Sequence, residues 1–129
     1  KPIWSIEKTM IKNILLVAFG GAVGSVLRYL VSKWLQEASS VAFPVGTLVV
    51  NVVGCLLIGL IYGASDRWGI SGDMRLLLTV GFCGGFTTFS TFMNESLSLM
   101  RADNLLSLAL YASLSVGLGL VAVWAGSRI

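Results

Sequence analysis

The sequence predicts an all-α integral membrane protein with four transmembrane helices. Of its 129 residues, 56% are hydrophobic and 12% are charged, whereas a soluble domain carries roughly 25% charged residues. The mean hydropathy is +0.88. Four apolar stretches are each close to the about 20 residues that cross a hydrocarbon core. We therefore expect one transmembrane domain over residues 1–129, with no extramembrane domain to bind nucleic acid or a soluble substrate.

The four spans are expected at residues 14–34, 45–64, 76–100 and 105–125. Polar or charged segments separate them, ending at Pro44, at Arg75 and at Asn104. Residues 1–9 are polar and precede Met10, a candidate start residue, so we treat them as an N-terminal extension outside the first span. A cleaved signal peptide is not expected, because the first apolar segment continues past the usual length of a signal core.

Glycine pairs at GxxxG spacing occur in the first three spans and allow helix backbones to approach closely. The pairs are Gly20 with Gly24, Gly59 with Gly63, and Gly81 with Gly85. For the first two pairs, ordinary helix packing is the simpler interpretation.

The third span contains a run, from Gly81 to Phe92, that predicts a break in the helix at mid-membrane. Two adjacent glycines are followed by Thr87 and Thr88, and backbone groups freed in hydrocarbon must find partners within the protein, in water or on an ion. Backbone carbonyls binding a small cation would satisfy them, as would capping by either threonine hydroxyl. A merely kinked packing helix explains these residues equally well.

Polar residues recur at helical spacing in three spans. Each could be explained by interhelical hydrogen bonds, which contribute only about 1 kcal/mol. Three such faces beside a glycine break favour a lined pathway, and Glu95 adds an acid inside a span, where ionisable residues usually have a function. The faces consist of Thr87, Thr91, Asn94 and Ser98; of Thr47, Asn51 and Gly54; and of Ser107, Tyr111, Ser115 and Gly119.

The charges and donors along this pathway suit an anion. Arg28 is a fixed positive charge in the first span, and Asn51 supplies amide donors in the second. Phe89 and Phe92 could present ring edges, the positive end of the aromatic quadrupole, although core packing or lipid contact would explain these two rings without an ion. The hydroxyls that could replace part of the water shell are those of Ser90 and Thr91.

Lysine and arginine show little bias between the two ends of the spans, and that bias normally sets orientation. With both termini inside, six basic residues lie inside and three outside, or four and three without the extension. An antiparallel dimer of oppositely inserted chains is therefore physically feasible. The inner set is Lys1, Lys8, Lys12, Arg67, Arg75 and Arg128, and the outer set is Arg28, Lys33 and Arg101.

From Met10 onward the sequence resembles the Fluc or CrcB family of fluoride channels. The matching segments are the glycine-rich run from Gly20 to Arg28, the run from Pro44 to Asn51, and Gly81 to Phe92 with Glu95, together with Tyr111. The Gly-Gly-Phe-Thr-Thr-Phe-Ser-Thr-Phe run is the most specific of these.

The resemblance implies an antiparallel, dual-topology homodimer in the bacterial cytoplasmic (inner) membrane, with two pores that pass fluoride passively and exclude chloride. It also implies a structural sodium ion at the break in the third helix, held by the backbone carbonyls of Gly84 and Thr87 from both chains. The pore positions would be Asn51, Phe89, Phe92 and the vestibule residue Arg28, with Ser90, Thr91, Glu95, Tyr111 and Ser115 along or near the pathway.

Two other classes of protein compete with this prediction. A small multidrug-type, dual-topology coupled transporter would need an embedded acid, for which Glu95 is the only candidate. A structural subunit of a larger complex would use the polar faces only to hold helices together. An enzyme is not expected, since no nucleophile and base occur at a spacing that brings them together and the chain has no histidine.

Overall fold

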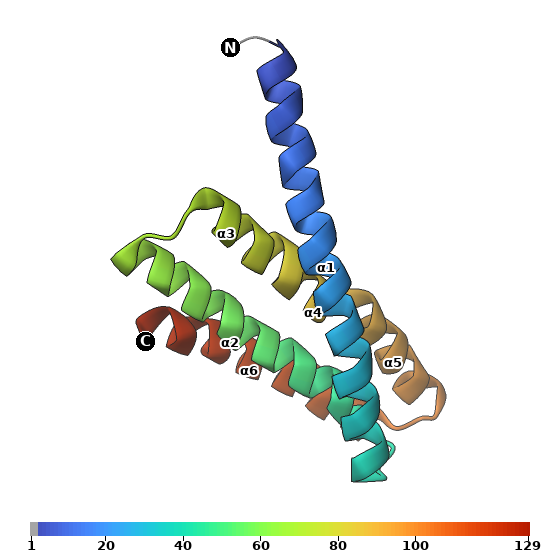
Figure 1. Ribbon diagram of the computed structural model, residues 1–129. Coiled ribbons are helices and arrows are strands. Elements are labelled where there is room, and N and C mark those ends of the chain that lie inside the picture. Colours follow the sequence, from blue (N-terminus) through green and yellow to red (C-terminus); the bar gives the residue numbers. More distant parts are fainter. Residues whose placement is uncertain (1–2) are drawn as a thin grey trace.

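The computed structural model describes residues 3–129, and every element within them is helical (Figure 1). Four helical spans are long and apolar enough to cross a membrane, the third being α3 to α5 with an interruption. The predicted four spans and the break in the third are thereby confirmed. The elements are α1 (Ile3–Ser39), α2 (Val45–Trp68), α3 (Gly72–Leu76), the π-helical η1 (Leu77–Cys83), α4 (Gly84–Phe86), α5 (Phe89–Arg101) and α6 (Leu105–Arg128).

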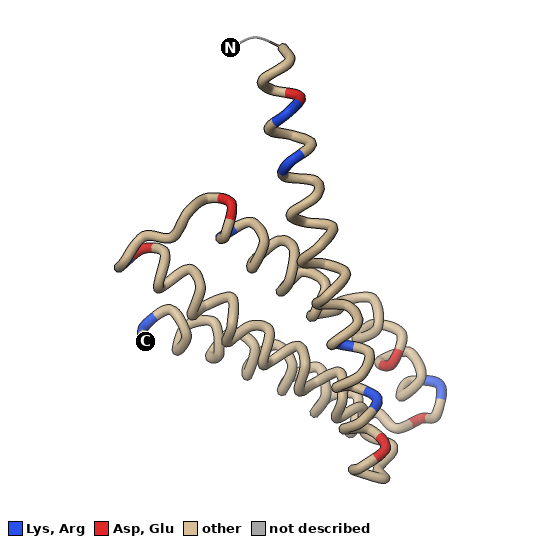
Figure 2. Tube along the Cα trace, in the orientation of Figure 1, with Lys and Arg blue, Asp and Glu red and all other residues tan. Residues whose placement is uncertain are grey.

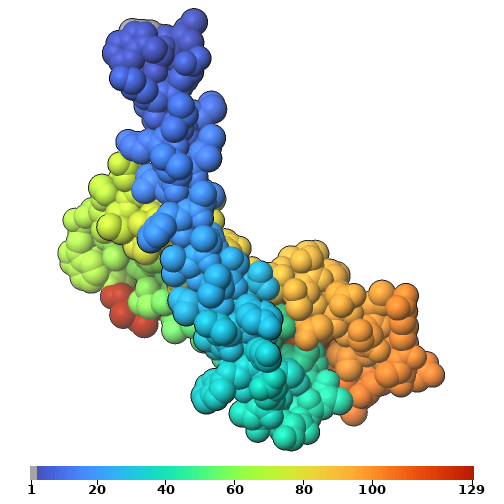
Figure 3. All heavy atoms as spheres, turned by 45° about the vertical axis from the view of Figure 1, so that its right-hand side comes forward, coloured from blue at the N-terminus to red at the C-terminus, as the bar shows by residue number. Residues whose placement is uncertain are grey.

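Helix α1 is longer than the predicted first span, because it begins at Ile3 and ends at Ser39. No glycine or proline occurs between residues 3 and 19, so nothing in the chain stops the helix at the edge of the apolar segment. Residues 3–9, which we set aside as an extension, are therefore continuous with the span. The first turns of α1 stand clear of the other helices (Figures 1 and 3).

Helices α2 and α6 run side by side (Figure 1) and meet through glycine. A Cβ atom on Gly126 would lie 2.5 Å from the Leu56 carbonyl oxygen, and one on Gly63 would lie 2.8 Å from that of Ser127. Gly59 likewise faces the backbone of Val123. Only hydrogen fits at these positions, so the two backbones touch as close small-residue packing predicts.

Helix α1 packs against η1 and α4 in the same way. A Cβ atom on Gly20 would lie 2.5 Å from the Leu77 carbonyl oxygen, and one on Gly85 would lie 2.6 Å from the Gly21 carbonyl oxygen. The first and third glycine pairs thus form one contact. This contact fixes η1 and α4, the part of the third span that precedes the break, against α1.

A small aromatic core lies beyond the break, where α5 meets α6. Phe92, Leu99 and Tyr111 are buried there, and Phe43 packs against them. The Phe92 and Tyr111 rings lie edge to face with centroids 5.0 Å apart, an arrangement aromatic pairs favour. This core fixes the position of α5 relative to α6.

Candidate functional site

The third span is broken at two threonines. Thr87 (φ −95°, ψ 160°) and Thr88 (φ −150°, ψ 122°) are both extended, so the helix stops after Phe86 and restarts at Phe89. The Thr87 hydroxyl donates to the Cys83 carbonyl at 2.9 Å. The Thr88 hydroxyl oxygen accepts from the Thr91 N–H at 3.2 Å, which is an N-cap. The two hydroxyls therefore cap the two helix ends.

Asn51 on α2 holds the break through both polar atoms of its side chain. Its Oδ1 accepts from the Thr88 N–H at 2.8 Å, and its Nδ2 donates to the Thr88 carbonyl at 3.1 Å. A single side chain thus pairs both backbone groups of one extended residue. Asn51 was predicted as a donor to an anion, and one of its two N–H bonds is already committed to the protein.

The break leaves particular carbonyls without their helical donors. In a continuous helix the Thr88 N–H would bond to the Gly84 carbonyl and the Thr91 N–H to the Thr87 carbonyl. Instead, the Thr88 N–H donates to Asn51 Oδ1 and the Thr91 N–H donates to the Thr88 hydroxyl oxygen. The oxygens of Gly84 and Thr87, the two predicted to bind a cation, are therefore among those released.

Arg28 satisfies a third carbonyl at the break. Arg28 lies on α1, and its Nε donates to the Gly85 carbonyl at 3.0 Å. Within residues 3–129 no three His, Cys, Asp or Glu side chains come together in a metal-binding group. A cation bound beside the break would thus depend on backbone and hydroxyl oxygens rather than on carboxylates.

Two cavities border the break, and Thr88 lines both of them. The larger has a volume of about 560 Å³ and the smaller about 410 Å³. Of the predicted site residues, the larger is lined by Asn51, Gly84, Thr87, Phe89, Phe92 and Ser115, and the smaller by Arg28, Thr91 and Glu95.

The larger cavity combines aromatic carbon with a buried, unpaired hydroxyl. The Ser115 hydroxyl is buried and has no hydrogen-bond partner among the described residues. Phe92 is 8% exposed and Phe89 is 73% exposed, with their ring centroids 6.0 Å apart at 62°. One ring is thus part of the core, and the other lies on the surface of the single chain.

The smaller cavity is polar and carries both signs of charge. Arg28 and Lys33 supply positive charge, and Glu37 and Glu95 supply negative charge. The Tyr111 hydroxyl, on a fully buried ring, donates to the Glu95 carboxylate at 3.3 Å. The same ring contacts Phe92, so Tyr111 connects the polar cavity to the aromatic core.

The structure brings most of the predicted site residues around one point but leaves some apart. Ser90 is exposed and borders neither cavity, with its hydroxyl 3.4 Å from that of Thr88. The polar face predicted on α5 also divides, because Thr91 turns toward Thr88 whereas Asn94 and Ser98 are exposed.

Gln36 was not among the predicted site residues, although it shapes the smaller cavity. Its Nε2 donates to the carbonyls of Val41 and Phe43 at 2.9 and 3.0 Å, and its Oε1 accepts from the Gly46 N–H at 3.1 Å. These bonds fold the turn between α1 and α2. The available signal was an amide residue at the end of a span, shortly before a proline.

Residues 15–127 match the family model of the CrcB-like proteins, Camphor Resistance (CrcB). A protein of Phocaeicola vulgatus is 48% identical over 115 residues, covering 89% of this chain and 95% of its own. One of Bacteroides fragilis is 49% identical over 121 residues (92% and 95%), and one of Rhizobium etli is 49% identical over 116 residues (89% and 93%). Each of the three is called fluoride-specific ion channel FluC.

Proposed function

We propose, on the premise that this chain belongs to the family of CrcB-like proteins, that it is a passive and selective fluoride channel. It is not an enzyme, because this family consists of ion channels. The observation that carries the proposal beyond the family name is the meeting of two cavities at the broken third helix, where Thr88 lines both.

Fluoride would enter through the smaller cavity, where Arg28 supplies positive charge. It would pass the hydroxyls of Thr88 and Thr91 and reach the larger cavity beside Phe92 and Ser115. Hydroxyl protons and positive ring edges would replace part of its water shell. Ser115 in the wall of this cavity supports the route, because its buried hydroxyl has no hydrogen-bond partner among the described residues and would gain one from an accepting guest.

We also assign the working unit to an antiparallel, dual-topology homodimer. In such a dimer a second chain over the larger cavity would cover Phe89, which is 73% exposed, and Val80, which is 57% exposed. A second copy would also bring its own broken helix to the same cavity.

A structural sodium ion fits the chemistry of the break in such a dimer. The released carbonyls of Gly84 and Thr87, doubled by the second chain, would give four hard oxygen ligands. When bound, the ion would compensate the lost helical hydrogen bonds. Replacing sodium by N-methylglucamine throughout purification and assay should then lower fluoride flux, and equal flux in both media would remove the ion from the proposal.

The proposed direction is export across the bacterial cytoplasmic membrane. Hydrogen fluoride crosses bilayers as a neutral weak acid and dissociates inside, which traps fluoride. A passive pore then lets the anion run down its own gradient without ATP or a coupled proton. The small multidrug-type transporter is not favoured, since the relatives of this chain are called fluoride-specific channels.

The test is efflux from liposomes that contain only the purified protein. Vesicles loaded with fluoride and chloride are diluted into a medium with neither, a potassium ionophore balances charge, and two ion-selective electrodes follow both anions. Fast fluoride release without chloride release supports the proposal. Fluoride release that requires an imposed proton or sodium gradient would refute passive transport, and equal release of both anions would refute selectivity. Light scattering of the same protein in detergent micelles, before reconstitution, gives the mass of the assembly, and a monomer would refute the dimer.

A further inference from the structure

A groove separates the first turns of α1 from the start of the third span, far from the break. Its volume is about 680 Å³, within the about 300–1,000 Å³ of sites that hold drug-sized ligands. Figure 3 shows the adjacent turns of α1 rising beyond the rest of the molecule. The wall is mostly apolar along its whole length, and Thr9 and Asn13 are its polar residues. The apolar residues are Ile6, Met10, Ile14, Val17, Ala18 and Leu76.

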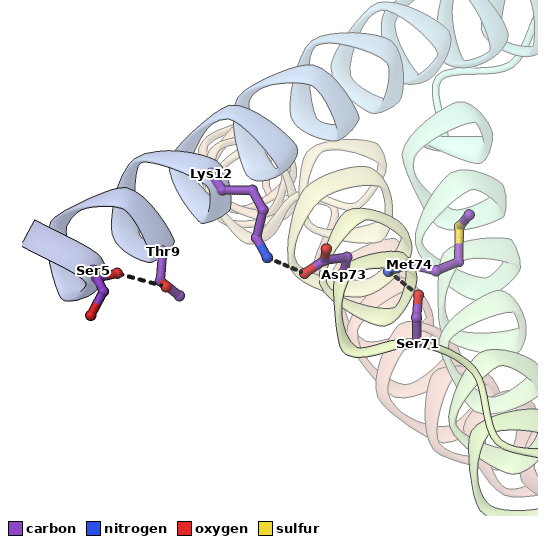
Figure 4. Close-up of polar contacts among 6 residues, drawn as sticks. All are labelled: Ser5, Thr9, Lys12, Ser71, Asp73 and Met74. Carbon is purple, nitrogen blue, oxygen red and sulfur yellow. Dashed lines mark hydrogen bonds and ion pairs between the residues drawn. The ribbon is translucent and has the colours of Figure 1, made fainter. Parts of the chain in front are cut away.

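An ion pair joins the two sides of this region. The Lys12 Nζ lies 3.2 Å from Asp73 Oδ1, and both side chains are about half exposed, at 54% and 53%. Asp73 sits in the first turn of α3, whose N-cap is Ser71, with the Ser71 hydroxyl oxygen accepting from the Met74 N–H at 3.1 Å (Figure 4). Charged and capping groups at this level indicate that it lies in the polar layer of the membrane.

The length of α1 also places the groove at the level of the lipid headgroups. At 1.5 Å per residue, residues 14–34 fill about 30 Å, the thickness of the hydrocarbon core. Residues 3–13 extend the helix by about 16 Å, through the headgroup layer of one leaflet. The groove, which uses residues 6–18 of α1, therefore crosses the boundary between headgroups and acyl chains.

Charge is unequal between the two ends of the molecule (Figure 2). At the far end three basic residues balance three acidic ones, whereas at the end with the groove five basic residues outnumber three acidic ones among the described residues. The groove end has Lys8, Lys12, Arg67, Arg75 and Arg128 against Glu7, Asp66 and Asp73, and the far end has Arg28, Lys33 and Arg101 against Glu37, Glu95 and Asp103.

We propose that this groove binds one anionic phospholipid, with an acyl chain against Ile14 and Ala18 and the phosphate near Lys8 and Lys12. These two lysines are one helical turn apart and flank the groove without lining it. Each directly precedes a polar residue of the wall, Thr9 or Asn13, and Lys12 is shared with Asp73. Apolar carbon on the hydrocarbon side and cations on the headgroup side match the two halves of such a lipid. The site lies outside the proposed fluoride route, so its test does not depend on conduction.

The experiment is native mass spectrometry of the delipidated full chain, titrated with phosphatidylglycerol or, separately, with phosphatidylcholine. The wild type should bind one phosphatidylglycerol per chain more tightly than phosphatidylcholine. Replacing both lysines, Lys8→Gln with Lys12→Gln, should weaken the phosphatidylglycerol affinity about thirtyfold, and Ala18→Phe, which fills the groove, should abolish it.

Two variants serve as matched controls. Arg101→Gln removes a cation from the balanced end, and Ala109→Phe adds a ring to an exposed position of α6; both should bind phosphatidylglycerol as the wild type does. Equal affinity for the two lipids, or retention by Ala18→Phe, would overturn the proposal. Loss of the dimer mass in Ala18→Phe would overturn it as well, because the groove would then belong to a second copy of the chain.

Discussion

Replacing Asn51 with leucine would remove the side chain that holds the break in place. Leucine is close to asparagine in size but has neither the acceptor nor the donor. The Thr88 N–H and carbonyl would lose bonds of 2.8 and 3.1 Å, and no other side chain within residues 3–129 is bonded to them. The extended residue would then be free to shift, and with it the boundary shared by the two cavities.

The expected loss of stability follows from these two bonds. Interhelical hydrogen bonds in membranes average about 0.6 kcal/mol and reach about 1.7 kcal/mol, while a buried polar group left unpaired costs about 1–3 kcal/mol. Thr88 is half-buried, so values near the lower limits apply. We expect Asn51→Leu to lower the free energy of unfolding by about 2 kcal/mol and to abolish fluoride flux. Asn51→Asp keeps the acceptor and loses the donor, and should also abolish flux while the dimer remains assembled.

The assay is reversible unfolding in mixed micelles, followed by far-ultraviolet circular dichroism, with flux measured on the same preparations. Asn94→Leu is the control, because it is the same change at an exposed position of α5 and should alter stability by less than about 0.5 kcal/mol. If Asn51→Leu unfolds and conducts as the wild type does, Asn51 does not hold the break.

Three further perturbations test separate parts of the structure. Gly85→Ala should lower the free energy of unfolding by about 1–3 kcal/mol, since its Cβ would lie 2.6 Å from the Gly21 carbonyl oxygen. Gly117→Ala, whose Cβ would have nothing within 4 Å, should be nearly neutral. Equal effects of the two changes in the same unfolding assay would contradict the proposed helix contact. Thr88→Val should lose about 1 kcal/mol through its N-cap, and Thr88→Ser should restore it; a valine variant as stable as the serine variant would argue against capping. Arg28→Gln should slow fluoride efflux most at low ionic strength, because salt screens a vestibule charge, and an effect independent of salt would assign Arg28 to holding the Gly85 carbonyl alone.

The spans could be predicted because residence in a bilayer depends on local composition. The break could be predicted as well, since two glycines followed by two threonines weaken a helix wherever they occur. The start of α1 could not, because hydropathy detects the hydrocarbon boundary and not the point where a helix ends. Nothing in residues 3–13 stops the helix, so it continues far beyond the apolar segment.

The partners of the break depend on contacts that local patterns do not contain. Asn51 meets Thr88 across 37 positions of sequence, and Arg28 meets Gly85 across 57. The sequence indicated amide donors on Asn51 deep in the second span and a positive charge on Arg28 at the outer part of the first, but it gave no partner for either. The same limit explains Gln36, whose role becomes visible only when the turn between α1 and α2 is folded.

Fluoride efflux through Phe92→Ile, compared with Phe86→Ile, tests most directly whether the ion passes the aromatic core beyond the break. Both phenylalanines are buried, at 8% and 6% exposure, but only Phe92 lines the larger cavity and contacts Tyr111. We expect Phe92→Ile to remain a folded dimer without fluoride flux and Phe86→Ile to conduct. Wild-type efflux through Phe92→Ile would contradict the proposed pathway.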